Sequence, residues 1–296
     1  MSAAGISVSF EFFPPADAAM EATLWSSLER LAPLAPRFVS VTYGADGSTR
    51  ERTHSLVTRI QQRTPLTGAA HLTCVGAPRE EIIAIARTYW REGVRHLVAL
   101  RGDPPHGQGR FCPHPHGFAG AAELVAALRE VAPFDISVAA YPEVHPEAVS
   151  PAADLDNLRR KLAAGASRAI TQFFYDSEVF LRFRDRCAAA GIDAPLVPGI
   201  LPITRFPQVL RFAQACGASI PPWLHQRFAG LEDDAETRRL IAASVAIEQV
   251  QALTRHGVHE FHFYTLNRAE LTYAICHALG LRPCAPAAGA APWVSA

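Results

Sequence analysis

The stretch ISVSFEFFPP, residues 6–15, combines the pattern of a buried strand with one charged side chain. Alternate residues of a strand face opposite sides, which separates the residues here into two sets. The apolar set is Ile6, Val8, Phe10 and Phe12, and the polar set is Ser7, Ser9 and Glu11. Glu11 therefore has two explanations. It lies on the wet face of a surface strand, or it is a catalytic acid directed into a pocket at the end of the strand.

Seven further strand-like runs follow, with helical patterns between them. The eight predicted strands span residues 6–13, 38–43, 69–75, 95–101, 135–141, 168–175, 194–200 and 258–265. Alternating strands and helices predict a parallel sheet, and eight such units in 296 residues fit a single (β/α)8 TIM barrel of the α/β class. A doubly wound open sheet is the alternative. We expect the barrel to occupy residues 1–283 and the Ala/Pro-rich residues 284–296 to form a loosely ordered tail.

The composition is that of a globular protein with a large core, since 49% of the residues are hydrophobic and 19% are charged. The formal net charge of +0 gives no reason to expect a nucleic-acid partner or binding to an anionic membrane. No apolar stretch is long enough to span a bilayer. The six cysteines form no CxxC pair and the N-terminus does not resemble a signal peptide, so we expect a cytoplasmic protein.

Polar side chains recur near the ends of the predicted strands, where the catalytic groups of TIM barrels collect. They are Glu11, Thr42, Tyr43, His71, Arg101, Asp103, Tyr141 and Gln172. A parallel barrel strand has no face in open solvent, so this fold favours a Glu11 that points into the barrel. Between Phe10, Phe12 and Phe13 its carboxyl group is expected to be desolvated. Desolvation raises a carboxyl pKa and would let Glu11 hold a proton near neutral pH.

Several longer strings occur together and in order. SFEFFPP, FVSVTYGA, HLVALRGDPP, ISVAAYPEVHPEA, RAITQFFYD and FHFYTLNRAE resemble bacterial methylenetetrahydrofolate reductase, and the resemblance covers residues 6–283. It implies a TIM barrel that binds FAD at the C-terminal ends of its strands and takes hydride from NADH or NADPH. The flavin would then reduce 5,10-methylenetetrahydrofolate to 5-methyltetrahydrofolate in a ping-pong cycle that feeds methionine synthesis. A homo-oligomer is also implied.

The resemblance assigns roles to individual residues. Glu11 would be the general acid that assists opening of the folate ring, and Asp103 would contact the pterin and tune the flavin. The FAD contacts would be Tyr43, Ala45, His71, Arg101, Gly102, Asp103, Tyr141, His145, Ala148, Asp154, Asn157, Arg160 and Lys161. Thr42 and Phe212 would contact the nicotinamide. The folate contacts would be Asp103, Gln172, Gln208, Phe212 and Arg268.

The segment HGQGRFCPHPHG, residues 106–117, is longer than its counterpart in that family. It holds Cys112, His114 and His116, but its prolines favour an extended path and no fourth ligand is fixed, so no metal site is predicted. No GxGxxG follows a strand, so FAD would lie on the barrel and not on a Rossmann unit. Two alternatives remain: a pterin- or folate-binding barrel without flavin, of the methyltransferase folate module or pteroate synthase type, and a non-catalytic flavin or folate binding protein.

Overall fold

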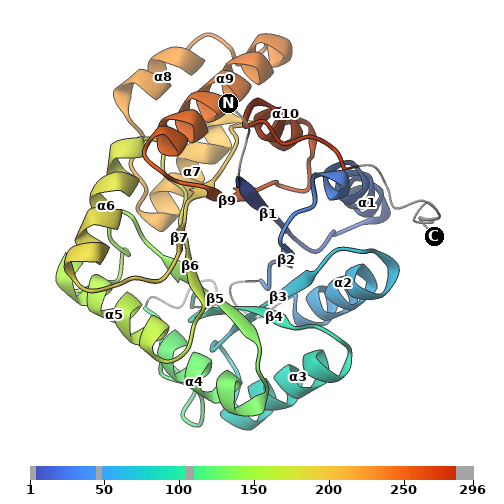
Figure 1. The fold of residues 1–296 in the computed structure, drawn as a ribbon, viewed down its shortest axis with the longest axis vertical. Coiled ribbons are helices and arrows are strands. Elements are labelled where there is room, and N and C mark those ends of the chain that lie inside the picture. Colours follow the sequence, from blue (N-terminus) through green and yellow to red (C-terminus); the bar gives the residue numbers. More distant parts are fainter. Residues whose placement is uncertain (1–4, 45–48, 105–109, 285–296) are drawn as a thin grey trace.

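The structure, a computed structural model, describes residues 5–44, 49–104 and 110–284. Its strands form one parallel sheet in which β1 pairs with β2 on one side and with the last strand, β9, on the other. Pairing of the first strand with the last curls the sheet into a ring, and helices surround it (Figure 1). The predicted TIM barrel is confirmed. The strands are β1 (Ser7–Phe12), β2 (Val39–Val41), β3 (Gly68–Thr73), β4 (His96–Leu100), β5 (Asp135–Ala140), β6 (Arg168–Thr171), β7 (Leu196–Val197), β8 (Gly199–Ile200) and β9 (Glu260–Tyr264).

The described residues form nine strands where eight were predicted, because Pro198 divides the seventh. β7 pairs with β6, and β8 pairs with β9. Proline has no N–H to donate, but the Pro198 carbonyl accepts a hydrogen bond of 3.0 Å from the His262 N–H. The next residue, Gly199, lies so close to its neighbours that an added Cβ would be 2.1 Å from the Thr171 carbonyl oxygen. The two short pieces therefore act as one barrel strand, and only glycine fits where it closes the ring.

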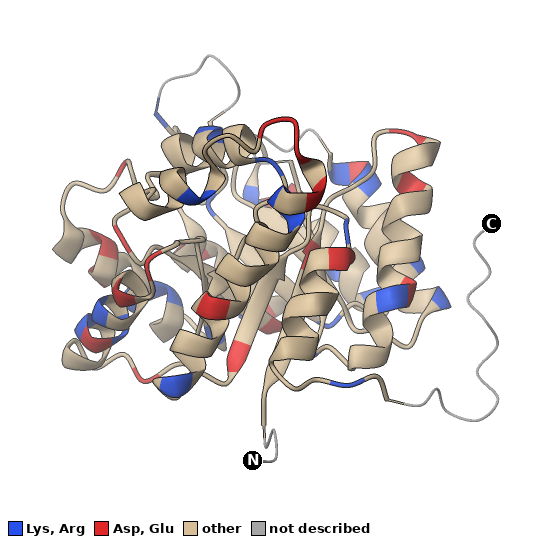
Figure 2. Ribbon diagram, turned by 90° about the horizontal axis from the view of Figure 1, so that it is seen from above, with Lys and Arg blue, Asp and Glu red and all other residues tan. Residues whose placement is uncertain are grey.

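The helices bury one apolar side against the outside of the ring. In α3 (Arg79–Arg91), for example, Ile82, Ala86 and Tyr89 recur at helical spacing and are buried. Acidic and basic residues are interspersed over the outer helices, in keeping with the balanced net charge (Figure 2). The other helices are α1 (Ala18–Leu31), the 3-10 helix η1 (Ala32–Leu34), α2 (Arg50–Arg63), α4 (Ala121–Val131), α5 (Pro151–Ala163), α6 (Ser177–Ala189), α7 (Phe206–Cys216), α8 (Pro222–Phe228), α9 (Ala235–Arg255) and α10 (Glu270–Ala278).

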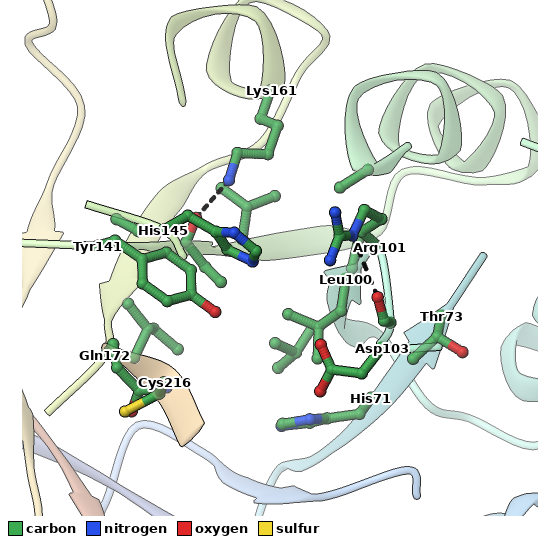
Figure 3. A pocket seen from close by; sticks show the side chains of 18 of the residues that line it. His71, Thr73, Leu100, Arg101, Asp103, Tyr141, His145, Lys161, Gln172 and Cys216 are labelled. Carbon is green, nitrogen blue, oxygen red and sulfur yellow. Dashed lines mark hydrogen bonds between the residues drawn. The ribbon is translucent and has the colours of Figure 1, made fainter. Parts of the chain in front are cut away.

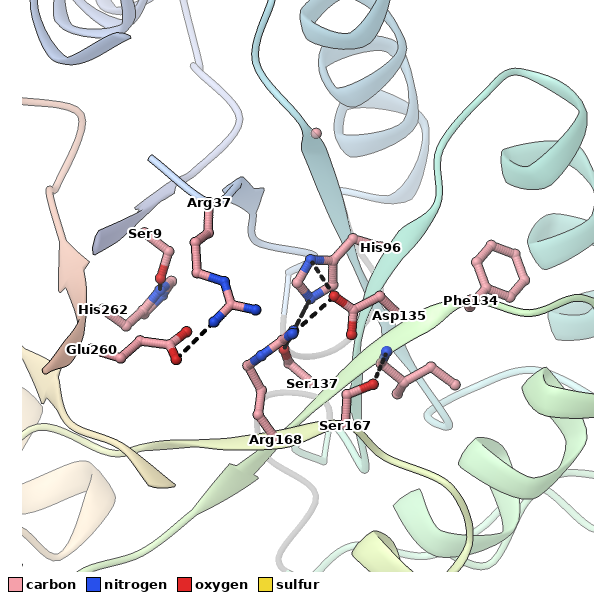
Figure 4. A network of polar contacts seen from close by, with 12 residues as sticks. Ser9, Arg37, His96, Phe134, Asp135, Ser137, Ser167, Arg168, Glu260 and His262 are labelled. Carbon is pink, nitrogen blue, oxygen red and sulfur yellow. Dashed lines mark hydrogen bonds and ion pairs between the residues drawn. The ribbon is translucent and has the colours of Figure 1, made fainter. Parts of the chain in front are cut away.

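Side chains of the opposite strand face fill the inside of the ring in layers, as in other TIM barrels. Phe10 and Phe12 belong to the main core, whereas Glu11 contacts side chains of β3 and β9 across the interior. One interior layer is an apolar cluster of Phe38, Ala69, Ile170 and Val197. Another, at the strand N-termini, is a polar network of His96, Asp135, Ser137 and Arg168 (Figure 4). Among the described residues, no helix is long and apolar enough to cross a membrane.

Candidate active site

A cavity of about 810 Å³ opens at the C-terminal ends of the strands (Figure 3). Strands β1, β3, β4, β5, β6 and β9 contribute residues to it, together with loops that follow the strands, including residues 42–44 after β2, and parts of α4, α5 and α7. Most residues singled out in the sequence line this one cavity. They are Glu11, Thr42, Tyr43, His71, Arg101, Gly102, Asp103, Tyr141, His145, Ala148, Asp154, Asn157, Arg160, Lys161, Gln172 and Phe212.

Two predicted folate contacts do not line the cavity. Gln208 is half-buried on α7, and Arg268 is exposed after β9. Arg268 follows a tight turn in which Asn267 has a φ of 59°. The Asn267 amide accepts a hydrogen bond from the Phe13 N–H and donates one to the Phe13 carbonyl, both 2.9 Å long, which holds this turn against β1. The folate roles of Gln208 and Arg268 stay predictions. Ala45 lies outside the described residues.

Two histidines surround the Glu11 carboxyl group. Glu11 Oε2 lies 3.2 Å from His71 Nε2 and 3.3 Å from His262 Nε2. The other ring nitrogen of His262, Nδ1, is 2.8 Å from Ser9 Oγ, and both of these residues are fully buried. His262 is therefore held between a hydroxyl group and the carboxyl group.

The predicted net increase in the Glu11 pKa is wrong. Burial does raise the pKa, as its position in the barrel suggested, but the charges and hydrogen bonds of His71 and His262 lower it by more, to about 2. The charge state of Glu11 thus depends on two side chains from other strands, β3 and β9.

The prediction missed Tyr264, which lines the cavity, and His262, which does not line it but contacts Glu11. Both lie on β9, where they alternate with Phe261 and Phe263 of the main core. The Tyr264 hydroxyl donates a hydrogen bond of 2.7 Å to the Thr171 carbonyl, and burial raises the Tyr264 pKa. The sequence did contain the information that was missed. Alternate residues of a strand face opposite sides, so the pattern that directs Glu11 inward also directs His262 and Tyr264 inward in FHFYT, residues 261–265.

Cationic side chains lie at the other end of the cavity. Lys161 of α5 is buried and donates a hydrogen bond to the Ala139 carbonyl of β5. Burial lowers the Lys161 pKa to about 8. Arg101, after β4, forms an ion pair of 2.5 Å with Glu147. Figure 3 shows Lys161 reaching toward the cavity from helix α5 and Arg101 lying directly after β4. A ligand with negative groups fits this end.

An aromatic wall lies beside these cations. The rings of Tyr141 and His145 meet edge to face, with centroids 4.6 Å apart. Asp154 accepts a hydrogen bond of 3.0 Å from the His145 N–H, and His145 Nδ1 accepts one of 3.0 Å from the Glu147 N–H. Burial lowers the pKa of the His145 imidazole. These bonds fix the loop after β5 and thereby position the wall.

The predicted loop with ligand-type residues lies beside the cavity. Of its residues, 106–109 fall outside the described residues. His114 Nδ1 accepts a hydrogen bond from the His116 N–H, and Cys112 is exposed. Among the residues that the structure describes, no group of three or more His, Cys, Asp or Glu side chains could hold a metal ion.

The fold and the cavity define an α/β barrel with its pocket where the enzymes of this architecture carry out their chemistry. Sequence comparison gives the family: residues 1–280 match methylenetetrahydrofolate reductase, and the chain belongs to this family. It is 59% identical over 278 residues to the 5,10-methylenetetrahydrofolate reductase of Salmonella typhimurium, covering 94% of this chain and 92% of that protein. The activity that defines the family is the reduction of methylenetetrahydrofolate.

A plant relative and a solved structure are more distant. The Arabidopsis thaliana methylenetetrahydrofolate reductase (NADH) 1 is 36% identical over 296 residues, which cover 96% of this chain and 50% of the plant protein. A Clostridium thermocellum protein that binds two copies of 5-methyl-5,6,7,8-tetrahydrofolic acid has a similar structure, with a TM-score of 0.59 over 93% of this chain and 95% of that one. At 14% identity, this likeness concerns the fold alone.

Proposed function

We propose that this protein is a flavin-dependent methylenetetrahydrofolate reductase. It would reduce 5,10-methylenetetrahydrofolate to 5-methyltetrahydrofolate with NADH or NADPH, in a ping-pong cycle through FAD that supplies methionine synthesis. The observation that supports this most directly is the cavity itself, which has a carboxyl group between two imidazoles at one end and a buried lysine with an arginine at the other. We further propose that residues 1–283 form one catalytic unit of a cytoplasmic homo-oligomer.

The chemistry of the cavity fits FAD. Pockets for drug-sized ligands and cofactors span about 300–1,000 Å³, and this one lies in the upper part of that range. Lys161 and Arg101 would hold the diphosphate, because both are cations that reach the cavity. Tyr141 and His145 would pack on flat parts of the cofactor, and Asp154 would accept from its hydroxyl groups. When bound, FAD supplies the hydride chemistry that no side chain can provide.

Glu11 and its two histidines would supply the proton. Opening the five-membered ring of the folate needs a proton on the nitrogen that leaves, and a positioned acid typically contributes about 10²–10⁴-fold. His71 Nε2 and His262 Nε2 lie 3.2 and 3.3 Å from the carboxyl oxygen, close enough for a proton to pass between an imidazole and Glu11. Gln172 would help bind the folate. Its Oε1 already accepts a hydrogen bond from the Phe173 N–H, which leaves the NH₂ group free to donate.

Anaerobic half-reactions test the proposal. The purified protein should carry FAD or take it up, and a nicotinamide should then bleach the flavin absorbance. Methylenetetrahydrofolate should restore that absorbance, and comparison of NADH with NADPH gives the preferred donor. A colourless protein that takes up no added FAD would refute the flavin-dependent reaction. Folate binding by such a protein would favour a pterin-binding barrel without flavin.

A further inference from the structure

The described part of the long loop, residues 110–117, crosses the side of the cavity that holds Arg101. The Phe111 ring packs on the Arg101 guanidinium group, whose carbon lies 4.7 Å from the ring centroid. The same guanidinium group also forms an ion pair, because its Nη1 lies 2.5 Å from Glu147 Oε2. Arg101 is therefore held by an aromatic face from one loop and a carboxylate from another.

The Glu147 carboxylate stays charged beside Arg101. Burial raises the Glu147 pKa, but Arg101 and the backbone N–H of Phe111 lower it by more, so the carboxylate stays charged. The Arg101 guanidinium group thus contacts both the charged Glu147 carboxylate and the Phe111 ring. Because a free arginine side chain has considerable rotamer entropy, such a fixed arrangement removes a cost that ligand binding would otherwise include.

The far end of the loop is fixed as well. The Arg79 N–H donates a hydrogen bond of 2.8 Å to the His116 carbonyl, and Arg79 Nε donates one of 2.9 Å to the Gly117 carbonyl. The Arg79 guanidinium also lies 4.7 Å from the centroid of the Phe118 ring. With Arg79 holding one end and Arg101 the other, Phe111 has a defined position beside the cavity.

We infer that Phe111 is a positioning residue for a phosphorylated flavin, acting through Arg101. Its ring holds the guanidinium group toward the cavity, so that Arg101 meets the diphosphate without first being ordered. This inference rests on the proposed function, because it concerns the binding of FAD. It gives the long loop a task in cofactor binding, and it assigns that task to a residue that does not itself line the cavity.

The test is the dissociation constant of FAD, measured by fluorescence quenching during titration of the cofactor-free protein. Phe111→Leu keeps an apolar side chain and removes the aromatic face, so binding should weaken about five- to tenfold. Phe111→Tyr should restore it. Cys112→Ser is the matched control in the same loop, because Cys112 is exposed and its thiol donates a weak hydrogen bond to the adjacent Pro113 carbonyl. Its FAD affinity should equal that of the unchanged protein.

A double-mutant cycle separates a positioning role from a general loosening of the loop. If Phe111 acts through Arg101, Phe111→Leu should cost little once Arg101 is replaced by Gln. The thermal midpoints of the cofactor-free proteins should agree. Equal FAD affinity of Phe111→Leu and the unchanged protein would overturn the inference, as would a full loss in the Arg101→Gln background. Failure of the unchanged protein to bind FAD would instead overturn the proposed function.

Discussion

The two ends of the barrel interior contain similar side chains in different states. At the cavity, Glu11 lies between His71 and His262. At the strand N-termini, His96 and Arg168 surround Asp135 (Figure 4). Phe38 separates the two groups, with its ring centroid 5.9 Å from that of His262 and 4.1 Å from that of His96. A buried carboxylate with a histidine is therefore not by itself a sign of catalysis.

The two carboxyl groups differ in their hydrogen-bond partners and in their position relative to the cavity. Arg168 donates to Asp135 at 2.9 Å and to Ser137 at 3.2 Å, and His96 Nε2 is 2.9 Å from Ser137 Oγ. These groups satisfy one another, and none of them lines the cavity. Glu11 instead meets both imidazoles through one oxygen and borders the cavity. Position along the strand separates the cases, because His96, Asp135 and Arg168 are the first residues of β4, β5 and β6.

The largest effect is expected for Glu11→Gln. The amide keeps the shape of the carboxyl group but cannot deliver a proton, so folate reduction should fall about 10²–10⁴-fold. Reduction of the bound flavin by nicotinamide should persist, because that half-reaction needs no acid. Stopped-flow traces of the two half-reactions provide the measurement, with Asp135→Asn as the control at the other end of the barrel. Equal losses in both half-reactions of Glu11→Gln would rule out the acid role.

Asp135→Asn should act on stability and not on chemistry. The substitution leaves Arg168 buried without its charged partner, and the half-exposed carboxylate limits the loss to about 2 kcal/mol in the free energy of unfolding. Urea unfolding measures the loss, and turnover per folded molecule should stay unchanged. A selective loss of turnover at unchanged stability would mean that the polar network at the strand N-termini takes part in the reaction.

The pH dependence of stability should report on His96. The His96 pKa is lowered from 6.5 to about 3, mainly by burial. Asp135 opposes this shift, whereas Arg168, His262 and Arg37 add to it. The unfolded chain then binds a proton that the folded protein does not, so stability is lost as the pH falls through this window. Between pH 7 and about pH 5.5 the loss from this group should be about 1 kcal/mol. Asp135, whose pKa is also lowered, adds to the loss only below its unfolded value of 3.8.

His96→Gln isolates this contribution. The variant has no imidazole to protonate, so its unfolding free energy should fall less over the same pH range, while the contribution of His145 stays common to both proteins. Parallel pH profiles of the two proteins in urea unfolding would contradict the lowered His96 pKa.

A smaller effect is expected for FAD affinity at alkaline pH. Lys161 has a pKa of about 8 in the free protein, and a diphosphate favours its charged form. The dissociation constant should rise about fourfold between pH 7 and pH 8.5, because the free protein must take up a proton to bind. Lys161→Arg keeps its charge over this range and should give a flatter profile. The same rise in both proteins would exclude Lys161 as the titrating group.

The sequence was sufficient for the fold and for the direction of Glu11, because period-two alternation is a local property of each strand. It was not sufficient for the charge state of that carboxyl group. His262 is 251 positions away, and its effect depends on the pairing of β1 with β9, in which Ser9 lies opposite His262. The sequence also did not show that Arg268 lies outside the cavity lining, for a different reason. The positive φ angles of Leu266 and Asn267 redirect the chain, and neither residue is a glycine that would have marked such a turn.

Lys161 is the only lysine in the sequence, and its ammonium group is buried beside the cavity. Reagents that acylate primary amines will therefore find a single side chain to modify, and reaching it means entering the place where a cofactor would lie. A label mapped to Lys161 by peptide mass spectrometry would record an empty cavity, and protection of Lys161, with only the α-amino group labelled, would record a filled one. The molecule thus carries its own occupancy probe, with no need for an engineered tag or dye.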